Sequence, residues 1–531
     1  MTRWAMVADL ERCVGCQTCT AACRHANATS PAVQWRKVLD IEAGAYPNVS
    51  RTFVPVGCQH CADPPCMHVC PTTATRRRPD GIVTIDYDIC IGCAYCDVAC
   101  PYQARFKIDA PSLAYGAVAL QSEIEREDLR LIGVAQKCTF CSDRIDFGLA
   151  NGLAPGIDPR ATPACVNACI ADALVFGDLD DPDSNVSRLL REQRNFRMHE
   201  ELGTQPGFFY LYGKADDSHE QGNAPPPVAS PQSGNLRTKG VEPWHQKHWD
   251  WKAAGNFICG GAGAGLFAIA AIASLRHGSM FPAGWVALAL VALGLFLVLL
   301  KIGRPARAIY VLRQPGRSWM AREAWVAMAF FPLAVLAMWF PTPYQLIPAA
   351  MLALLFLFSQ AKILKEAKGI PAWRTQAVVP LIVATGLAEG AGLFLAAVSL
   401  RPSLATIIEA TAIAAVLLTA LRSWTWRTYI AALEIEGAPK RTLEVLDAFR
   451  PWFFTFGLAL PVILIGAGFV VTKAAIPLLA LGGASIFAAG AALKLVLVTR
   501  AAFNQGFALT HTPVRGSGVA GPAVKPGWSM P

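Results

Sequence analysis

The sequence predicts an α+β domain rich in cysteine, followed by an all-α bundle of eight transmembrane helices. Sixteen of the 17 Cys residues lie before residue 170, in a chain of 531 residues that is 53% hydrophobic and only 16% charged. This composition is too apolar for a purely soluble protein, and the chain is too long for one ordinary domain. It also excludes a disulfide-stapled secreted fold, because such scaffolds are short.

The charges divide at the same place as the cysteines. Residues 1–213 hold 20 Lys and Arg against 25 Asp and Glu, whereas residues 214–531 hold 27 against 13. The net charge of +9 therefore belongs to the apolar half. Cations in such a half flank membrane helices and do not form a nucleic-acid surface. We therefore expect membrane lipid, and no nucleic acid, among the partners.

Four segments are expected along the chain. Residues 1–213 combine the cysteine motifs with short strand-like runs. Residues 214–243 are rich in Pro, Gly, Ser and Asn and contain hardly an apolar residue, so they are predicted to be a linker. Residues 244–510 form the membrane part, and residues 511–531 form a C-terminal tail.

The cysteines of the first segment fall into four groups. The groups are Cys13, Cys16, Cys19 and Cys23; Cys58, Cys61, Cys66 and Cys70; Cys90, Cys93, Cys96 and Cys100; and Cys138, Cys141, Cys165 and Cys169. Two groups share the spacing C-x2-C-x2-C-x3-C, one widens its middle gap, and the last contains an inserted loop. Three closely spaced thiolates can hold three corners of a cubane cluster, while the fourth cysteine reaches a neighbouring cluster. The sixteen thiolates suffice for four [4Fe-4S] clusters.

Zinc is the alternative metal for these cysteines. Structural zinc sites favour two C-x2-C pairs separated by a finger or knuckle, and they have no use for the compact third cysteine. Free thiols or disulfides are a weaker alternative in a reducing compartment. A zinc-bound scaffold without redox activity stays open as an interpretation that metal analysis can decide.

The first 210 residues resemble the four-cluster ferredoxin subunit of dimethyl sulfoxide reductase-type molybdopterin oxidoreductases. The motifs CVGCQTCTAAC, CQHCADPPCMHVCP and CIGCAYCDVACP carry this resemblance. It implies a ferredoxin-like double bicluster fold in which the cysteine groups pair as nested sets. The implied sets are Cys13, Cys16, Cys19 with Cys169; Cys138, Cys141, Cys165 with Cys23; Cys58, Cys61, Cys66 with Cys100; and Cys90, Cys93, Cys96 with Cys70.

Eight apolar blocks of about 20 residues follow the linker, each long enough to span a bilayer. They begin near Ala254, Pro282, Ala324, Tyr344, Ala377, Pro402, Trp452 and Ile476. The segments on one side of these blocks hold 23 Lys and Arg, whereas those on the other side hold only Arg276, Arg401 and Lys473. By the positive-inside rule, we expect a multi-pass protein of the inner membrane with the cysteine-rich domain and both termini in the cytoplasm.

The second half resembles the eight-helix, quinone-binding membrane anchor of the same enzymes. The segment KIGRPARAIYVLRQPGRSWMAREAW, between the second and third blocks, carries this resemblance. Ferredoxin subunit and anchor are usually separate proteins, and here one chain joins them. The resemblance implies a catalytic partner that holds molybdopterin with Mo or W, since no such segment is present in this sequence.

A quinone, either menaquinone or ubiquinone, is the expected electron carrier in the membrane. No haem is expected, because none of the nine His residues lies well inside a span. Candidate quinone-binding residues near the cytoplasmic end are His245, His248, Asn256, Arg304, Arg322 and Glu323. The alternative is that the Arg and His residues are interfacial or phospholipid contacts and that Asn256 is a helix-packing residue.

Two acidic residues lie within the predicted spans. Glu389 is near the middle of the fifth span and Glu409 is within the sixth. An uncompensated charge there costs a few kcal/mol or more, so both are expected to be protonated or paired, and a proton path to the quinone is a hypothesis. The alternative is a structural hydrogen bond between neighbouring helices.

Together these observations predict an electron-transfer and membrane-anchor subunit of an oxidoreductase complex. Quinone reduction is the expected direction, as in the cytoplasm-facing relatives sulfite dehydrogenase and phenylacetyl-CoA:acceptor oxidoreductase. The alternatives are a quinol-oxidising anchor of a reductase and a redox-linked proton-translocating module. No catalytic residue is expected in the chain itself.

Overall fold

The computed structural model describes residues 2–45, 48–113, 118, 120, 121, 125, 128–214, 240–277, 281–400, 405–513 and 523–528. The chain forms two compact units: a cysteine-rich unit, Met1–Trp244 with Gln505–Pro531, and a helical unit, His245–Asn504. Residues 215–239, which make up most of the predicted linker, lie outside the described residues.

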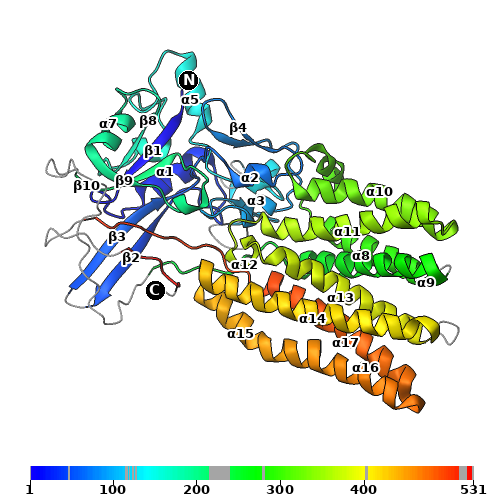
Figure 1. Cartoon of the computed structure of the whole chain (residues 1–531). Helices are drawn as coiled ribbons and strands as arrows, with labels where there is room; N and C mark the ends of the chain where they lie inside the picture. Colours follow the sequence, from blue (N-terminus) through cyan, green and yellow to red (C-terminus); the bar gives the residue numbers. More distant parts are fainter. Residues whose placement is uncertain are drawn as a thin grey trace. The chain divides into compact units, whose positions relative to one another are not determined.

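A four-stranded sheet in the order β8-β1-β10-β9 lies in the cysteine-rich unit (Figure 1). Its strands are β1 (Trp4–Asp9), β8 (Leu174–Asp178), β9 (Gln193–Phe196) and β10 (Phe208–Lys214). β1 pairs parallel with β10 and antiparallel with β8, so that Met6 lies opposite both Phe208 and Phe176. All six residues of β1 are buried. Burial of both faces explains why this strand is a nearly continuous apolar run.

Three antiparallel hairpins complete the strand structure among the described residues. They are β2 (Lys37–Ala45) with β3 (Asn48–Val56), β4 (Thr75–Arg77) with β5 (Val83–Ile85), and β6 (Phe106–Lys107) with β7 (Ala135–Gln136). The β2-β3 hairpin is much the longest (Figure 1). Its inward side chains, including Leu39, Ile41 and Val54, pack in the main core together with Met6 of the sheet.

Short helices follow the strands, and four of them carry cysteines. The helices are α1 (Thr18–Asn27), α2 (Pro65–His68), α3 (Tyr95–Val98), α5 (Ser142–Ala150), α6 (Ala164–Asn167) and α7 (Asn185–Glu192), with 3-10 turns η1 (Leu129–Leu131) and η2 (Glu200–Leu202). The third cysteine of each group lies on one of them, at Cys19, Cys66, Cys96 and Cys165. The fourth follows four residues later, about one helical turn away. This spacing lets neighbouring cysteines of one motif serve different sets.

The C-terminal residues return to the cysteine-rich unit after the last membrane helix. Phe507, Leu509 and Val524 are buried in its main core, and Leu509 forms an isolated bridge with Val524. The His511 ring stacks on Tyr212 of β10 at 4.5 Å between centroids. The predicted membrane part, residues 244–510, includes residues 505–510, and residues 511–531 are predicted to be a C-terminal tail. In the structure the described residues of both ranges instead pack with the cysteine-rich unit.

The helical unit consists of long helices that run side by side (Figure 1). They are α8 (Trp251–His277), α9 (Phe281–Leu299), α10 (Trp319–Trp339), α11 (Pro343–Lys365), α13 (Val378–Ser399), α14 (Ala405–Glu436), α15 (Lys440–Phe454), α16 (Leu460–Val470) and α17 (Ala475–Thr499). Shorter elements are η3 (Pro305–Arg313), α12 (Pro371–Arg374), the π-helical turn η5 (Thr455–Ala459) and η6 (Thr472–Ala474). Within the described residues, eight segments are long and apolar enough to cross a membrane, with α15, η5 and α16 forming one of them.

Close packing of small residues explains why α13 lies at the centre of this bundle. Of its spanning window, 72% is buried within the protein, compared with 28% for α9. A Cβ atom on Gly265 of α8 would lie 2.1 Å from the Gly386 carbonyl oxygen, and one on Gly483 of α17 would lie 2.2 Å from that of Gly392. Glycine therefore lets α8 and α17 approach the α13 backbone directly. The predicted fold class, an α+β domain followed by eight apolar helices, is confirmed.

Candidate functional site

The sixteen cysteines come together in four sets, numbered here 1 to 4. Set 1 is Cys13, Cys16, Cys19 and Cys169; set 2 is Cys138, Cys141, Cys165 and Cys23; set 3 is Cys58, Cys61, Cys66 and Cys100; set 4 is Cys90, Cys93, Cys96 and Cys70. Sets 1 and 4 each line a small cavity. In sets 2 and 3 the members lie close enough for their charges to act on Cys23 and on Cys61. The structure thus groups the cysteines as the family resemblance implies.

The thiols of these sets fit iron–sulfur clusters better than single metal ions. Among the described residues, no three His, Cys, Asp or Glu side chains are placed to hold one ion, whereas the cysteines of sets 1 and 4 surround a space. Burial raises the pKa of Cys138 to about 11 and that of Cys100 to about 12. Such thiols lose their protons when a strongly electrophilic metal centre binds the sulfur in their place. A bound [4Fe-4S] cluster would supply one-electron transfer at each set.

The cysteine loops share one backbone feature. The residue before the second cysteine has a positive φ in every group: Gly15 at 72°, His60 at 42°, Gly92 at 67° and Phe140 at 54°. Left-handed backbone is rare for residues other than glycine, so His60 and Phe140 need support from their surroundings. Their rings stack on each other at 3.7 Å, and the His60 Nδ1 atom accepts a hydrogen bond from the Val83 backbone N–H at 3.1 Å.

Backbone N–H groups also donate to the cysteine sulfurs. The Ala173 N–H lies 3.2 Å from the Cys169 Sγ, and the Phe140 N–H lies 3.4 Å from the Cys138 Sγ. Such hydrogen bonds stabilise negative charge on sulfur and are one of the ways in which proteins set cluster potentials. The loops therefore prepare the sets for an anionic group.

Three cations that the sequence analysis did not single out are buried among the sets. Arg36 is 1% exposed, Arg105 is 3% exposed and Lys137 is fully buried. The Arg105 Nη2 atom donates to the Cys66 Sγ at 2.8 Å, and the Lys137 Nζ atom donates to the Cys138 carbonyl oxygen at 2.6 Å. Burial and all three cations lower the pKa of His60 well below its usual value. Little in the sequence indicated these three cations, because only Lys137 is next to a motif cysteine.

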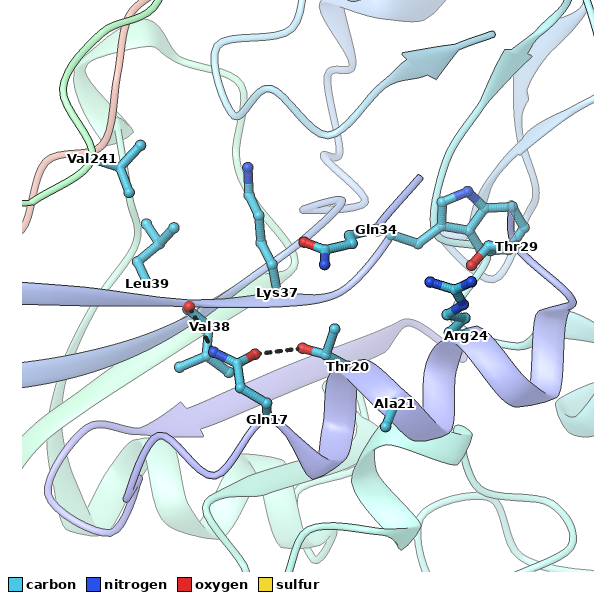
Figure 2. Close-up of a pocket in the computed structure, with 11 residues that line it drawn as sticks. Gln17, Thr20, Ala21, Arg24, Thr29, Gln34, Lys37, Val38, Leu39 and Val241 are labelled. Carbon is cyan, nitrogen blue, oxygen red and sulfur yellow. Dashed lines mark hydrogen bonds between the residues drawn. The ribbon is translucent and has the colours of Figure 1, made fainter. Parts of the chain in front are cut away.

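An open pocket lies beside set 1, between α1 and β2 (Figure 2). Gln17 and Val38 line both this pocket and the set 1 cavity, and the Gln17 Nε2 atom donates to the Val38 carbonyl oxygen at 3.2 Å. Arg24 and Lys37 also line the pocket, and no acidic residue is among its described lining residues. Of the sixteen motif cysteines, all of which the structure describes, only Cys16 of set 1 is exposed. Set 1 is therefore the most accessible of the four.

In the helical unit, three of the predicted quinone residues lie in or beside a buried polar cluster. The Asn256 Nδ2 atom of α8 donates to the Glu323 Oε1 atom of α10 at 3.5 Å, and the Gln360 Nε2 atom of α11 donates to the Asn256 carbonyl oxygen at 3.0 Å. The Asn256 Oδ1 and Gln360 Oε1 atoms are buried and have no hydrogen-bond donor within the described protein. These two acceptors are free to receive a donor such as a hydroxyl group.

Glu389, the third of these residues, forms a buried ion pair that the sequence analysis missed. The Lys494 Nζ atom of α17 lies 2.5 Å from the Glu389 Oε2 atom of α13, and both side chains are completely buried. Lys494 also donates to the Phe257 carbonyl oxygen at 2.8 Å. A Cβ atom on Gly261 would meet both the Lys494 Nζ and the Gln360 Oε1 atoms, so Gly261 separates the ion pair from the cluster around Asn256.

Arg422 of α14 extends this polar region on the other side of Glu389. It is fully buried, and its charge acts on Glu389. Its Nη2 atom donates to the Gly457 carbonyl oxygen of η5 at 2.5 Å, and its Nη1 atom donates to the Ile486 carbonyl oxygen at 2.9 Å. The π-helical turn thus presents a free carbonyl to Arg422, which is typical of π-bulges at functional positions.

The other predicted quinone residues are placed differently. Glu409 is exposed on the outside of the bundle. Arg322 donates to the carbonyl oxygens of Pro315 and Gly316 at 2.7 and 2.8 Å, and so holds the loop before α10.

The two histidines and the remaining arginine lie at the ends of the bundle. His245 and His248 precede α8 and are partly buried, and burial lowers the pKa of His245. Arg304 is partly buried at the start of η3. The hydrogen bonds that join Asn256 to Glu323 and Gln360 involve none of these three residues.

Comparison with known families assigns the cysteine-rich unit to a class. Residues 49–114 match the family of 4Fe-4S dicluster domains. This range contains all of Cys58, Cys61, Cys66 and Cys70 and all of Cys90, Cys93, Cys96 and Cys100. The protein is therefore of the iron–sulfur class.

Known relatives narrow the class to a family. The chain is 41% identical to a Halobacterium salinarum protein named as an iron–sulfur subunit of dimethyl sulfoxide reductase, over 40% of this chain and 80% of that protein. It is 38% identical to a subunit of the sulfite dehydrogenase of Allochromatium vinosum, over 40% of this chain and 83% of that subunit. It is 34% identical to the iron–sulfur cluster-binding subunit of menaquinone reductase of Nitratidesulfovibrio vulgaris, over 39% of this chain and 88% of that subunit. The chain belongs to the family of iron–sulfur subunits of dimethyl sulfoxide reductase-type oxidoreductases, and it carries eight apolar helices in addition.

Proposed function

We propose that this chain passes electrons between a cytoplasmic molybdopterin catalytic subunit and the membrane quinone pool through four [4Fe-4S] clusters. The observation that carries the proposal is the arrangement of sixteen cysteines in four sets, in a chain that also contains eight apolar helices. The first feature supplies redox centres and the second supplies access to a lipid-soluble carrier.

The fold supports placing both flanks of the membrane part on one side of the membrane. Residues before Trp244 and residues after Gln505 form one compact unit, and an even number of spans separates them. The excess of Lys and Arg in the segments on that side favours the cytoplasm as its location. The iron–sulfur unit would then face a cytoplasmic catalytic partner.

Set 1 is the proposed point of electron exchange with that partner. Cys16 is exposed, and the adjoining pocket presents Arg24 and Lys37 without a lining acid. An acidic segment of the partner would be attracted to this surface, which would speed association and fix its orientation. The molybdopterin content of the partner is proposed from the oxidoreductase names of the relatives.

The polar cluster around Asn256, Glu323 and Gln360 is the proposed quinone contact. Its two buried acceptors without a donor suit the hydroxyl groups of a quinol, and Glu323 can take up or release a proton. Quinone reduction is the proposed direction, since relatives include a sulfite dehydrogenase subunit and a menaquinone reductase subunit. Quinol oxidation in a reductase is the alternative, favoured by the relative named for dimethyl sulfoxide reductase.

Metal analysis of the purified chain tests the cluster assignment. We expect sixteen iron and sixteen sulfide per chain, matching the sixteen motif cysteines. Zinc at four per chain, one for each cysteine set, without acid-labile sulfide would instead indicate the zinc scaffold.

A matched pair of variants tests the quinone side. Glu389→Gln should slow turnover with menaquinone or ubiquinone analogues, because Lys494 then loses the carboxylate that compensates its buried charge. Glu409→Gln, at an exposed acid, should leave turnover within twofold of the wild type. Rates measured with quinone plus dithionite-reduced protein and with quinol plus oxidised protein give the favoured direction. Equal rates in wild type and Glu389→Gln, with clusters intact, would refute a role for Glu389.

Redox-linked proton translocation is a second candidate, favoured by one observation. Buried ionisable groups continue from Glu323 towards Glu389, Lys494 and Arg422, across α10, α13, α17 and α14. Intramembrane ionisable residues commonly mark proton or ion paths. Proteoliposomes given reductant and quinone would show a membrane potential beyond that expected from scalar proton uptake, and a Lys494→Met variant should lose this excess.

A further inference from the structure

The three buried cations of the cysteine-rich unit are interleaved with the four cysteine sets. Arg36 acts on Cys19 of set 1 and on Cys138 and Cys165 of set 2. Its guanidinium lies 3.0 Å from the Met6 Sδ atom and 4.9 Å from the centre of the Phe208 ring. Its Nε atom has no acceptor within the described protein. Arg36 therefore lies between sets 1 and 2, in otherwise apolar surroundings.

The second buried cation, Lys137, is close to sets 2 and 3. Its ammonium group donates to the carbonyl oxygen of Cys138, which belongs to set 2, at 2.6 Å. Its charge also acts on Cys58 and Cys66 of set 3. The side chain is fully buried, and within the described residues it forms no ion pair with a carboxylate. Lys137 therefore lies between sets 2 and 3.

The third buried cation, Arg105, is close to sets 3 and 4. It donates to the Cys66 Sγ atom of set 3 at 2.8 Å and to the Thr75 Oγ1 atom at 3.1 Å. Its charge also acts on Cys96 of set 4. Asp97 is a nearby carboxylate whose charge interacts with Arg105. The order along the unit is thus set 1, Arg36, set 2, Lys137, set 3, Arg105 and set 4.

A cluster held by four thiolates is anionic, and it gains one more negative charge on reduction. A fixed cation beside it therefore stabilises the reduced form more than the oxidised form. The effect is strong here because the cations are buried, where solvent screens charges poorly. A cation between two clusters also reduces the repulsion between them when both are reduced. A single residue at each interval can thus set both potentials of one electron-transfer step.

We propose that Arg36, Lys137 and Arg105 set the reduction potentials of the three cluster-to-cluster steps, each raising the potentials of the two clusters between which it lies. The proposal rests on the proposed four-cluster function and deepens it. It identifies three residues that act on electron transfer through the clusters and that are neither cluster ligands nor quinone contacts.

Redox titration of the purified full chain, with dithionite and mediators and with the clusters followed by electron paramagnetic resonance, tests the proposal. Arg36→Gln, Lys137→Gln and Arg105→Gln should each lower the equilibrium constant for reduction of two adjacent clusters at least tenfold. For a one-electron couple this is about 59 mV. The affected pair should move along the unit with the substitution: sets 1 and 2, then 2 and 3, then 3 and 4. Arg51→Gln, at an exposed arginine paired with Asp40, is the control and should shift none.

Charge-retaining variants separate electrostatics from packing. The variants to test are Arg36→Lys, Lys137→Arg and Arg105→Lys. Each should keep sixteen iron per chain, which matches the sixteen motif cysteines, and should keep near-native reduction potentials. If a neutral variant loses iron while its charge-retaining counterpart keeps it, the requirement for charge is supported. Loss of iron in both would overturn the proposal, since packing would then be decisive. Full iron content with unchanged potentials, or an equal shift of all clusters, would also overturn it.

The outcome for the wild type is separate from these results. A wild-type chain with fewer than four clusters would refute the proposed function itself. A wild-type chain with four clusters but without pairwise shifts in the variants would refute only the role of the three cations.

Discussion

The two units bury positive charge in different ways. In the cysteine-rich unit, Arg36, Lys137 and Arg105 are enclosed among thiols whose negative charge is realised fully only when metal is bound. In the helical unit, Lys494 is enclosed beside Glu389, which the chain itself provides. The first arrangement depends on a cofactor for its counter-charge, whereas the second is complete in the polypeptide. The stability of the two units should therefore respond differently to metal.

Removal of iron should produce the largest difference in stability between the two units. Oxidation followed by excess chelator is expected to make the cysteine-rich unit sensitive to protease, because the three buried cations lose the negative charge of the clusters and the buried thiols become protonated. The helical unit should keep its helical circular dichroism and its protected fragments. Simultaneous loss of both units, or resistance of both, would contradict the comparison.

Lys494→Met should have the next largest effect, confined to the helical unit. It leaves the carboxylate of Glu389 buried without its partner, which costs about 3–5 kcal/mol of stability. Thermal denaturation in detergent would measure this loss. The double variant Lys494→Met/Glu389→Gln should recover most of it, because neither member of the ion pair is then left buried without the other.

Lys473→Met is the control for this cycle. It removes a cation from an exposed position in η6, just before α17, and should change stability by no more than about 0.5 kcal/mol. If the single and double variants at Lys494 were equally unstable, loss of packing and not loss of charge compensation would explain the effect.

Lys37 provides the smallest and most specific test, through pH. It packs at 4.9 Å from the Trp244 ring and 5.1 Å from the Phe507 ring, and burial lowers its pKa from 10.5 to about 8. Between these two values the unfolded chain binds more protons than the folded chain, so stability rises with pH. Wild type should gain about 1–3 kcal/mol relative to Lys37→Met between pH 8 and 10.5. A flat difference in thermal stability across this range would show that Lys37 keeps its charge.

Local patterns in the sequence were sufficient for the eight spans and for the cysteine groups. A span needs only a continuous apolar run, and a cluster motif needs only closely spaced cysteines. The buried charges were harder to predict, because their partners are distant in the chain. Lys494 and Glu389 are 105 residues apart. One signal was available, since Lys494 is the only Lys or Arg of residues 214–531 that falls in neither group of loop cations.

Other features depend on tertiary structure in ways that composition does not reveal. The loop pattern groups Arg422 with the cytoplasmic cations, yet the structure buries it within α14. Glu389 and Glu409 look equivalent as acids within spans, but one faces Lys494 and the other lies on the outer surface. The direction in which a helix faces is set by all of its neighbours, and a weakly amphipathic apolar helix carries little information about it.

The return of the C-terminal segment has a consequence for biosynthesis. Phe507, Leu509 and Val524 belong to the core of the cysteine-rich unit, but the ribosome makes them after all eight spans. The core formed by the first 244 residues therefore lacks these side chains while the membrane helices are synthesised and inserted. The last segment can reach that core only if it emerges on the same side of the membrane as the first 244 residues, which requires an even number of crossings. Completion of the core therefore depends on membrane insertion.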